Sequence, residues 1–221
     1  KKTGKTVWNT DNVARSGYTQ PVIIDYRGTR AALVFHGRRA LCYDIEKNKG
    51  KILFEHPWRT SYDVNASNPQ FLDNKVFMAS GYGMGYTVID VSGSKPKVLH
   101  KDEDTRMIFQ NSLLVDGDIM GVFGDKGIDA ELIRMDMATG KAHWKKSMPG
   151  TRGSSLLIGE HLVILAETGD LIVGKPTKSG WTELGRIKPL DKLCWSYLAY
   201  SNGRLFARNN DGKAVVLDVT P

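Results

Sequence analysis

The chain has 221 residues, 41% of them hydrophobic, and a formal net charge of +7. This length allows one large all-β domain or two small domains with a real core. No apolar run approaches the roughly 18 residues that a membrane-spanning helix needs. The positive charge is spread along the chain without a block of like charges, so we interpret it as a solvated surface and expect no nucleic-acid partner.

The first recognisable segment is TGKTVW at residues 3–8. It matches the second half of a longer motif, LIRMDMATGKAHW at residues 132–144, in which a strand precedes the turn. The N-terminal segment therefore predicts an outer strand at residues 4–8 whose preceding strand is missing. With no initiator Met and no signal peptide, we expect a processed product or a piece of a longer protein.

A repeat follows along the chain. Asp44, Asp90 and Asp136 each end a strand-like stretch and stand 46 residues apart, and Asp218 lies 82 residues further on. A period in the forties made of short alternating strands is typical of propeller blades. The long final interval predicts one degenerate unit that has lost the Asp and the Trp.

Each unit divides into four strands, a to d, by alternation of apolar residues and by turn residues. We therefore predict an all-β fold, a β-propeller of four-stranded antiparallel blades with about five blades in this chain. The chain forms one domain, residues 1–221, with blades at about 18–56, 68–100, 110–146, 153–187 and 195–221.

The last unit has strands a, b and c but lacks d, which leaves two alternatives for the outer strand at 4–8. That strand pairs with residues 213–218 and closes a five-bladed ring without an open edge. Otherwise, the chain is the C-terminal portion of a larger ring.

The turn motif has a structural rationale. Asp accepts hydrogen bonds from turn amides, Gly supplies a positive φ, and the following Trp packs between neighbouring blades. We assign this docking role to the following residues: Trp8, Asp44, Asp90, Asp136, Gly140, Trp144 and Asp218. Phe54 stands in place of the Trp in the first complete unit.

MDMATGKAHW resembles the docking motif of pyrroloquinoline-quinone-like repeat proteins. That family includes quinoprotein alcohol dehydrogenases, the propeller lipoprotein of the outer-membrane β-barrel assembly machinery and bacterial polyvinyl-alcohol dehydrogenase-like proteins. The resemblance covers essentially the whole chain and implies a propeller, in the family usually of eight blades. It also implies a periplasmic or secreted location.

The quinone enzymes of this family use a vicinal disulfide, a Trp floor, a Glu/Asn/Asp calcium cluster and an Asp base. Cys42 and Cys194 are far apart in the sequence, and no calcium set stands at matching positions. We therefore expect no cofactor; pyrroloquinoline quinone and calcium belong only to the alternative function. No catalytic residue and no metal site are assigned.

The d–a segments and b–c loops of a propeller gather on one face, where the inner strands line a channel. Four arginines fall in these d–a segments and would suit an anionic ligand or an acidic partner. The predicted binding residues at this mouth are Arg15, Arg59, Arg106, Arg152, Asn65, Asn111 and Trp195.

Two functions remain open at this point. The first is a non-catalytic extracytoplasmic propeller, expected to be monomeric, that binds a protein or an anionic polymer. The alternative is a quinoprotein-type oxidoreductase acting on alcohols or polyvinyl alcohol. The missing Cys-Cys pair and calcium set favour the first, so enzymatic activity is not expected.

Overall fold

The computed structural model describes residues 2–10 and 14–220. Blade 1 consists of β1 (Val22–Tyr26), β2 (Thr29–Phe35), β3 (Arg39–Asp44) and β4 (Ile52–Pro57). Blade 2 consists of β5 (Gln70–Leu72), β6 (Lys75–Ser80), β7 (Gly85–Asp90) and β8 (Lys97–Asp102). Blade 3 consists of β9 (Leu113–Val115), β10 (Asp118–Asp125), β11 (Ile128–Asp136) and β12 (Ala142–Ser147).

Blade 4 consists of β13 (Gly153–Ile158), β14 (His161–Ala166), β15 (Leu171–Pro176) and β16 (Trp181–Ile187). Blade 5 has three strands among the described residues: β17 (Ala199–Ser201), β18 (Arg204–Arg208) and β19 (Ala214–Asp218). Within each sheet, neighbours in sequence pair antiparallel. The predicted all-β propeller fold is confirmed.

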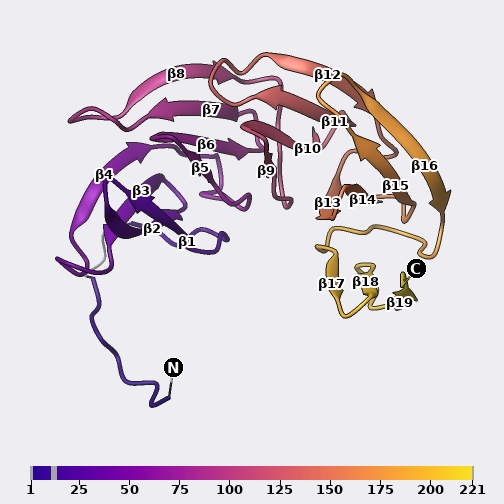
Figure 1. Cartoon of the computed structure of the whole chain (residues 1–221), viewed down its shortest axis with the longest axis horizontal. Helices are drawn as coiled ribbons and strands as arrows, with labels where there is room; N and C mark the ends of the chain where they lie inside the picture. Colours follow the sequence, from indigo (N-terminus) through magenta and orange to yellow (C-terminus); the bar gives the residue numbers. More distant parts are fainter. Residues whose placement is uncertain (1, 11–13, 221) are drawn as a thin grey trace.

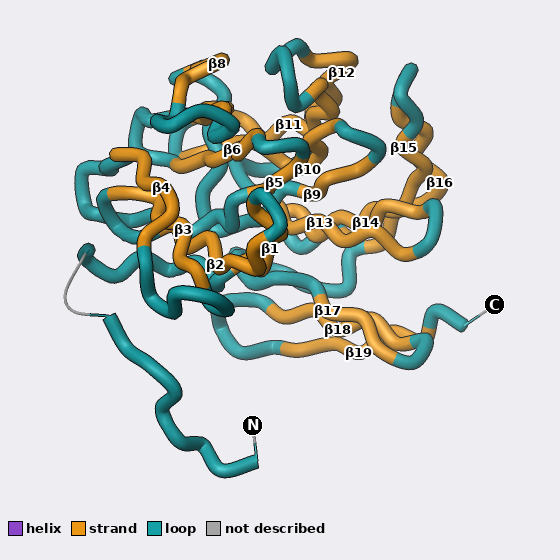
Figure 2. The backbone as a smooth tube through the Cα atoms, turned by 60° about the vertical axis from the view of Figure 1, so that its left-hand side comes forward, coloured by secondary structure: helices purple, strands orange, loops and turns teal. Residues whose placement is uncertain are grey.

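The five sheets follow one another along an open arc (Figure 1). The strands β8, β12 and β16 run along its outer side, and the first strands of the blades lie towards its inner side. Figure 2 shows strands and loops throughout, without a helix among the residues drawn. The arrangement leaves the d–a loops and b–c loops free to carry a binding site.

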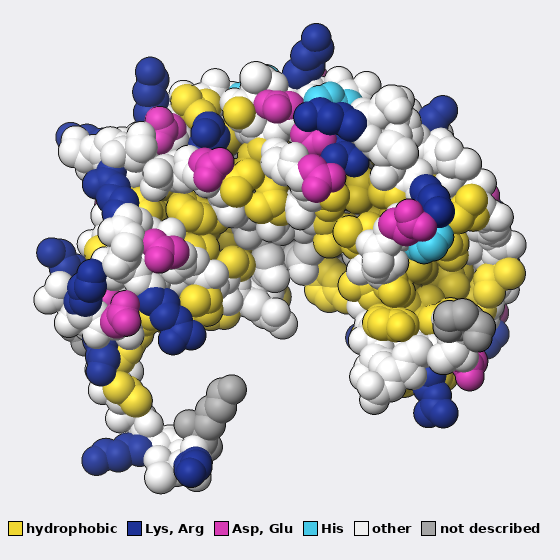
Figure 3. All heavy atoms as spheres, viewed as in Figure 1, with side chains coloured by type: hydrophobic (Ala, Val, Ile, Leu, Met, Phe, Trp, Pro, Cys, Tyr) yellow, Lys and Arg dark blue, Asp and Glu magenta, His cyan; other side chains and the backbone are white. Residues whose placement is uncertain are grey.

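The hydrophobic core is divided among the spaces between adjacent sheets. Four clusters of buried residues fill these spaces, and each of them draws on two neighbouring blades. Figure 3 shows the apolar side chains gathered between the sheets, with lysine and arginine side chains around the outer rim. A blade thus buries its faces only by stacking on its neighbours.

A register shift marks the same position in the outer strand of blades 1 to 4. In each blade the outer strand has one unpaired residue, and the next outer-strand residue pairs again with the third strand. Its partners on the third strand are, in the four blades, Cys42, Val88, Arg134 and Val173. We call this first paired residue after the bulge the docking position. In chain order it is Phe54, His100, Trp144 and Gly185. Blade 4, predicted to be degenerate, therefore has no side chain where the other three carry a ring.

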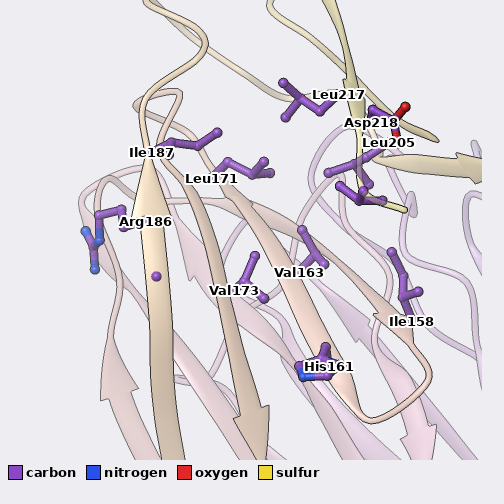
Figure 4. A pocket seen from close by; sticks show the side chains of 12 residues that line it. Ile158, His161, Val163, Leu171, Val173, Arg186, Ile187, Leu205, Leu217 and Asp218 are labelled. Carbon is purple, nitrogen blue, oxygen red and sulfur yellow. The ribbon is translucent and has the colours of Figure 1, made fainter. Parts of the chain in front are cut away.

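An apolar groove of about 500 Å³ opens beside Gly185, between blades 4 and 5. In Figure 4, Leu171 and Val173 lie on one side of it and Leu205 and Leu217 on the other. No atom lies within 4 Å of the position where a β-carbon of Gly185 would stand. The groove is consistent with the missing ring, because a side chain at this position would project into open space.

Replacing Gly185 with phenylalanine is expected to stabilise the protein by about 1–2 kcal/mol. The new ring restores the docking residue, and glycine in a strand interior is itself unfavourable. Urea unfolding measures the change. Gly180→Phe, in the preceding exposed turn, is the control, and an equal gain from it would contradict the docking explanation.

The predicted N-terminal strand does not form. Residues 4–8 belong to no strand, and nothing among the described residues pairs with β19 beyond β18. In Figure 1 the N-terminal segment extends on the blade 1 side of the arc, away from blade 5. The Trp8 ring lies 3.3 Å from the point that a β-carbon would occupy at Gly50, the turn glycine of blade 1. The strand predicted at residues 4–8 is therefore wrong, and in this structure the segment does not close a five-bladed ring, because it pairs with no strand of blade 5.

Candidate functional site

The aspartates of the repeat hold the c–d turns. Asp44 accepts hydrogen bonds from the amides of Glu46, Lys47 and Asn48. Asp90, Asp136 and Asp218 accept corresponding bonds from Ser92, Thr139 and Thr220. The Thr139 hydroxyl also donates to Asp136 and helps to lower the pKa of that carboxyl. These four carboxylates are engaged in the turns and are not arranged for chemistry.

The ring residues of the motif connect one blade with the next. Trp144 donates through Nε1 to the carbonyl oxygen of Thr177 in blade 4 at 2.9 Å. Gly140 has a φ of +69°, and a β-carbon there would collide with the ring of His100 in blade 2. The glycine is required both for the turn and for this close approach. Trp144 and Gly140 therefore belong to the packing between blades.

The two predicted asparagines make hydrogen bonds within the protein. Asn65 is buried, donates to the carbonyl of His36 at 2.7 Å and accepts from the Ser80 hydroxyl at 2.7 Å. Asn111 accepts from the amide of Asn68 at 2.7 Å and from the Tyr197 hydroxyl at 3.5 Å. Both ends of the Asn65 amide are thus occupied within the protein, whereas at Asn111 the contacts engage the amide oxygen.

Arg152 and Trp195 lie in contact and share a network with two acidic side chains, in which Arg152 is largely buried and Trp195 is 38% exposed. The Arg152 guanidinium lies 3.1 Å from Glu167 and 3.6 Å from Asp125, and 4.9 Å from the centre of the Trp195 ring. Trp195 donates to Glu167 at 2.6 Å and stacks on Phe109. Burial acts to raise the pKa of Glu167, but hydrogen bonds from Thr151 and Trp195 lower it overall.

Arg15 and Arg59 converge on a carboxylate that the sequence did not single out, Asp63. Arg15 Nη1 lies 2.8 Å from Asp63 Oδ2, and Arg59 Nε lies 3.3 Å from Oδ1. Arg38, from the b–c loop of blade 1, binds the same carboxylate through Nε at 2.9 Å and Nη2 at 3.0 Å. Three guanidinium groups surround one carboxylate, so the cluster keeps a net charge of +2.

The hydrogen bonds from Arg38, followed by those from Arg15, hold the pKa of Asp63 far below its ordinary value of 3.8. For a carboxyl with a depressed pKa, the stabilisation is complete above the unfolded-state pKa and is lost as the pH falls through the lower folded-state value. The cluster therefore keeps its charges throughout the neutral and mildly acidic range. The three arginine side chains remain between 42% and 69% exposed, available to solvent and ligands.

Two tyrosines lie beside this cluster. Tyr62 precedes Asp63 in the d–a loop and is 75% exposed, and Tyr82, from the b–c loop of blade 2, is 37% exposed. Their rings pack edge to face with centroids 5.4 Å apart. We call Arg15, Arg38, Arg59, Tyr62 and Tyr82 the arginine–tyrosine patch. Tyrosine and arginine are both more frequent at protein–protein interfaces than on the rest of a protein surface.

The predicted Arg106 joins neither group among the described residues. Its Nε donates to the carbonyl oxygen of Glu103, three residues earlier, at 3.0 Å. The structure brings the predicted Arg15 and Arg59 together on Asp63. Four residues of this region were not among the predicted ones: Arg38, Tyr62, Asp63 and Tyr82. The signal was present in the segments HGRRA and RTSYD, which are a b–c loop and a d–a loop of the same rim.

The described residues do not fit a quinone cofactor with its calcium. Across residues 2–10 and 14–220, no group of three or more His, Cys, Asp or Glu side chains is placed to hold a metal ion. Cys42, in blade 1, and Cys194, before blade 5, are both free and buried. The Trp195 ring already stacks on Phe109 and lies against Arg152. This part of the chain thus offers no such metal-ion group, and its Trp195 indole is already in contact with two other side chains.

A separate observation concerns membranes. In the part of the chain that the structure covers, no helix has the length and apolar character needed to cross a bilayer.

Comparison with known proteins gives one family. The family model described as outer membrane protein assembly factor BamB matches residues 1–157. No curated protein matches the sequence.

Similar solved structures include BamB and two dehydrogenases. BamB from Moraxella catarrhalis superposes with a TM-score of 0.65 and 17% identity, covering 96% of this chain and 63% of that one. A europium-containing methanol dehydrogenase gives 0.71 and 12%, covering 97% and 51%. A quinohemoprotein alcohol dehydrogenase from Pseudomonas putida HK5 gives 0.64 and 12%, covering 92% and 40%. The chain thus spans less than two thirds of each of these structures, and the likeness shows the fold alone.

Proposed function

Because the chain belongs to the family of outer membrane protein assembly factor BamB, we propose that it is a non-catalytic scaffold that binds a protein partner outside the cytoplasm. The arginine–tyrosine patch carries this proposal. It combines two exposed aromatic rings with a net charge of +2 on loops that two blades hold in place. Such a surface suits an acidic protein segment with apolar side chains.

The family includes an assembly factor by name, which favours a binding role over a catalytic one. The periplasmic or secreted location is part of the proposal, as is the monomeric state of the free protein. An acidic protein is preferred to an anionic polymer because the tyrosine pair offers apolar contact area that a simple polyanion would not use.

Co-purification from envelope extracts of the source organism tests the proposal. The wild type is expected to recover a discrete protein that Tyr62→Ala with Arg59→Glu loses by about tenfold or more. Tyr200→Ala with Arg204→Glu, an exposed tyrosine and an arginine in blade 5, is the matched control and should recover it fully. Recovery by all three proteins, or recovery of an anionic polysaccharide instead, would overturn the proposal.

The alternative is a quinoprotein dehydrogenase, since such enzymes are among the similar structures. Reconstitution with pyrroloquinoline quinone and calcium, followed by dye reduction with alcohols, is expected to give no turnover. The reason is the misfit of the described residues with that cofactor set. Saturable turnover that disappears in Trp195→Ala would establish the dehydrogenase and contradict the scaffold.

A further inference from the structure

A second recess lies next to the arginine–tyrosine patch, in the space between blades 1 and 2. It has a volume of about 430 Å³ and lies within the range usual for small-molecule sites. Its apolar lining includes Trp58, Met84 and Val98, and its cationic lining includes Arg38, Arg59 and Lys101. We call it the blade 1–2 groove. Unlike the groove beside Gly185, it combines an apolar lining with several positive charges.

The apolar part of the groove is held rigidly. Trp58 is 4% exposed and donates from its indole nitrogen to the Ser80 hydroxyl at 3.0 Å, which fixes its ring between the blades. Met84 comes from the GYGMG loop at 81–85, and a β-carbon at Gly85 would collide with the carbonyl of Asp102. The glycine therefore allows this loop to close against the end of β8. Because this wall of the groove is already ordered, ligand binding would cost little conformational entropy in these side chains.

The cationic side chains around the groove use only some of their hydrogen-bond donors within the described chain. Arg59 reaches Asp63 through Nε alone, at 3.3 Å, and its two terminal nitrogens have no hydrogen-bond acceptor within the described chain. Arg38 uses Nε and Nη2 on Asp63, which leaves Nη1. Lys101 pairs with Glu103 at 2.6 Å, at a position where both side chains are substantially exposed. The guanidinium groups thus retain donors suited to an oxyanion.

We propose that the blade 1–2 groove binds small amphipathic carboxylates, with the apolar body against Trp58, Met84 and Val98 and the carboxylate at Arg59 and Arg38. Binding of a small molecule in this groove is a different function from the proposed binding of a protein at the patch, although both sites include Arg38 and Arg59. Carboxylate recognition by Arg is directional, because its planar donors match the two carboxylate oxygens. The apolar part of the ligand adds affinity because its surface is removed from water on binding.

Calorimetric titration with matched probes tests the proposal. The probes are 4-phenylbutanoate, the neutral 4-phenylbutanol and acetate, which share either the apolar body or the charge. We expect saturable binding of 4-phenylbutanoate, binding of the alcohol weaker by about tenfold or more, and none for acetate. Equal affinities for carboxylate and alcohol, or no saturable binding of 4-phenylbutanoate, would overturn the proposal.

Variants locate the site. Val98 is 48% exposed on the outer strand of blade 2, so Val98→Trp fills the groove without disturbing the core and should abolish binding. Leu99→Trp, one residue further and outside the groove lining, is the control for the same substitution. Arg59→Gln should weaken binding by about tenfold, and Arg106→Gln should leave it unchanged. Binding that survives Val98→Trp would place the ligand elsewhere and refute the assignment.

Discussion

Replacing Asp118 with alanine is expected to lower the free energy of unfolding by about 3–5 kcal/mol. Asp118 and Arg134 are almost completely buried in blade 3, with side chains 1% and 3% exposed. Their ion pair is 2.7 Å long, and His143 contacts the other carboxylate oxygen at 3.0 Å. Without Asp118, the buried Arg134 charge keeps only the solvent-exposed Asp116 as a partner, which is far costlier than losing an exposed pair.

The same arginine provides the control. Asp116 lies 3.4 Å from Arg134 but is 82% exposed, so Asp116→Ala should cost less than about 1 kcal/mol. Thermal unfolding of the two variants measures the difference. The double variant Asp118→Leu with Arg134→Met should recover most of the loss, because it removes both charges together. Equal destabilisation by the two single alanine variants would contradict the explanation.

Reversing two charges of the patch is expected to weaken partner binding by about a hundredfold. Arg15→Glu with Arg59→Glu changes the cluster around Asp63 from a net charge of +2 to −2, and so repels an acidic segment. The measurement is surface-based kinetics with the protein recovered by the wild type. The association rate should fall most, since charge complementarity acts mainly on encounter.

Salt distinguishes this effect from misfolding. Raising the ionic strength should weaken binding by the wild type, because exposed charges are screened over about 8 Å at physiological salt. It should change the double variant much less. Arg204→Glu, with an added charge reversal in blade 5, is the control and should bind as the wild type does. Wild-type affinity that does not depend on salt would contradict the electrostatic role of the patch.

The fold could be predicted from the sequence because its signals are local. The strand that ends in Asp136, the turn at Gly140 and the ring of Trp144 are adjacent in the chain, and their spacing repeats. The role of His100 could not be seen, because a bulge shifts the register and sets which residue reaches the docking position. The same shift hides Gly185, whose neighbours in sequence give no sign of a groove.

The candidate site was predicted only in part because its contacts join distant loops. Arg15 and Asp63 are 48 residues apart, and Arg38 reaches the same carboxylate from another loop. Arg152 was predicted at the mouth from its place in a d–a segment, but the pattern gave no sign of Glu167 and Asp125, which occupy its guanidinium. Sequence position thus indicates the face on which an arginine lies, whereas its freedom to bind a ligand depends on tertiary partners.

The claim that the arginine–tyrosine patch binds a protein is tested most directly by photocrosslinking in cells of the source organism. A photoreactive phenylalanine analogue replaces Tyr62, which belongs to the patch and is 75% exposed, or Tyr200 in blade 5 as the control. Irradiation should give one discrete protein adduct from position 62, lost when Arg15→Glu and Arg59→Glu are added, and no such adduct from position 200. The absence of an adduct at position 62, or the same adduct from both positions, would contradict the account.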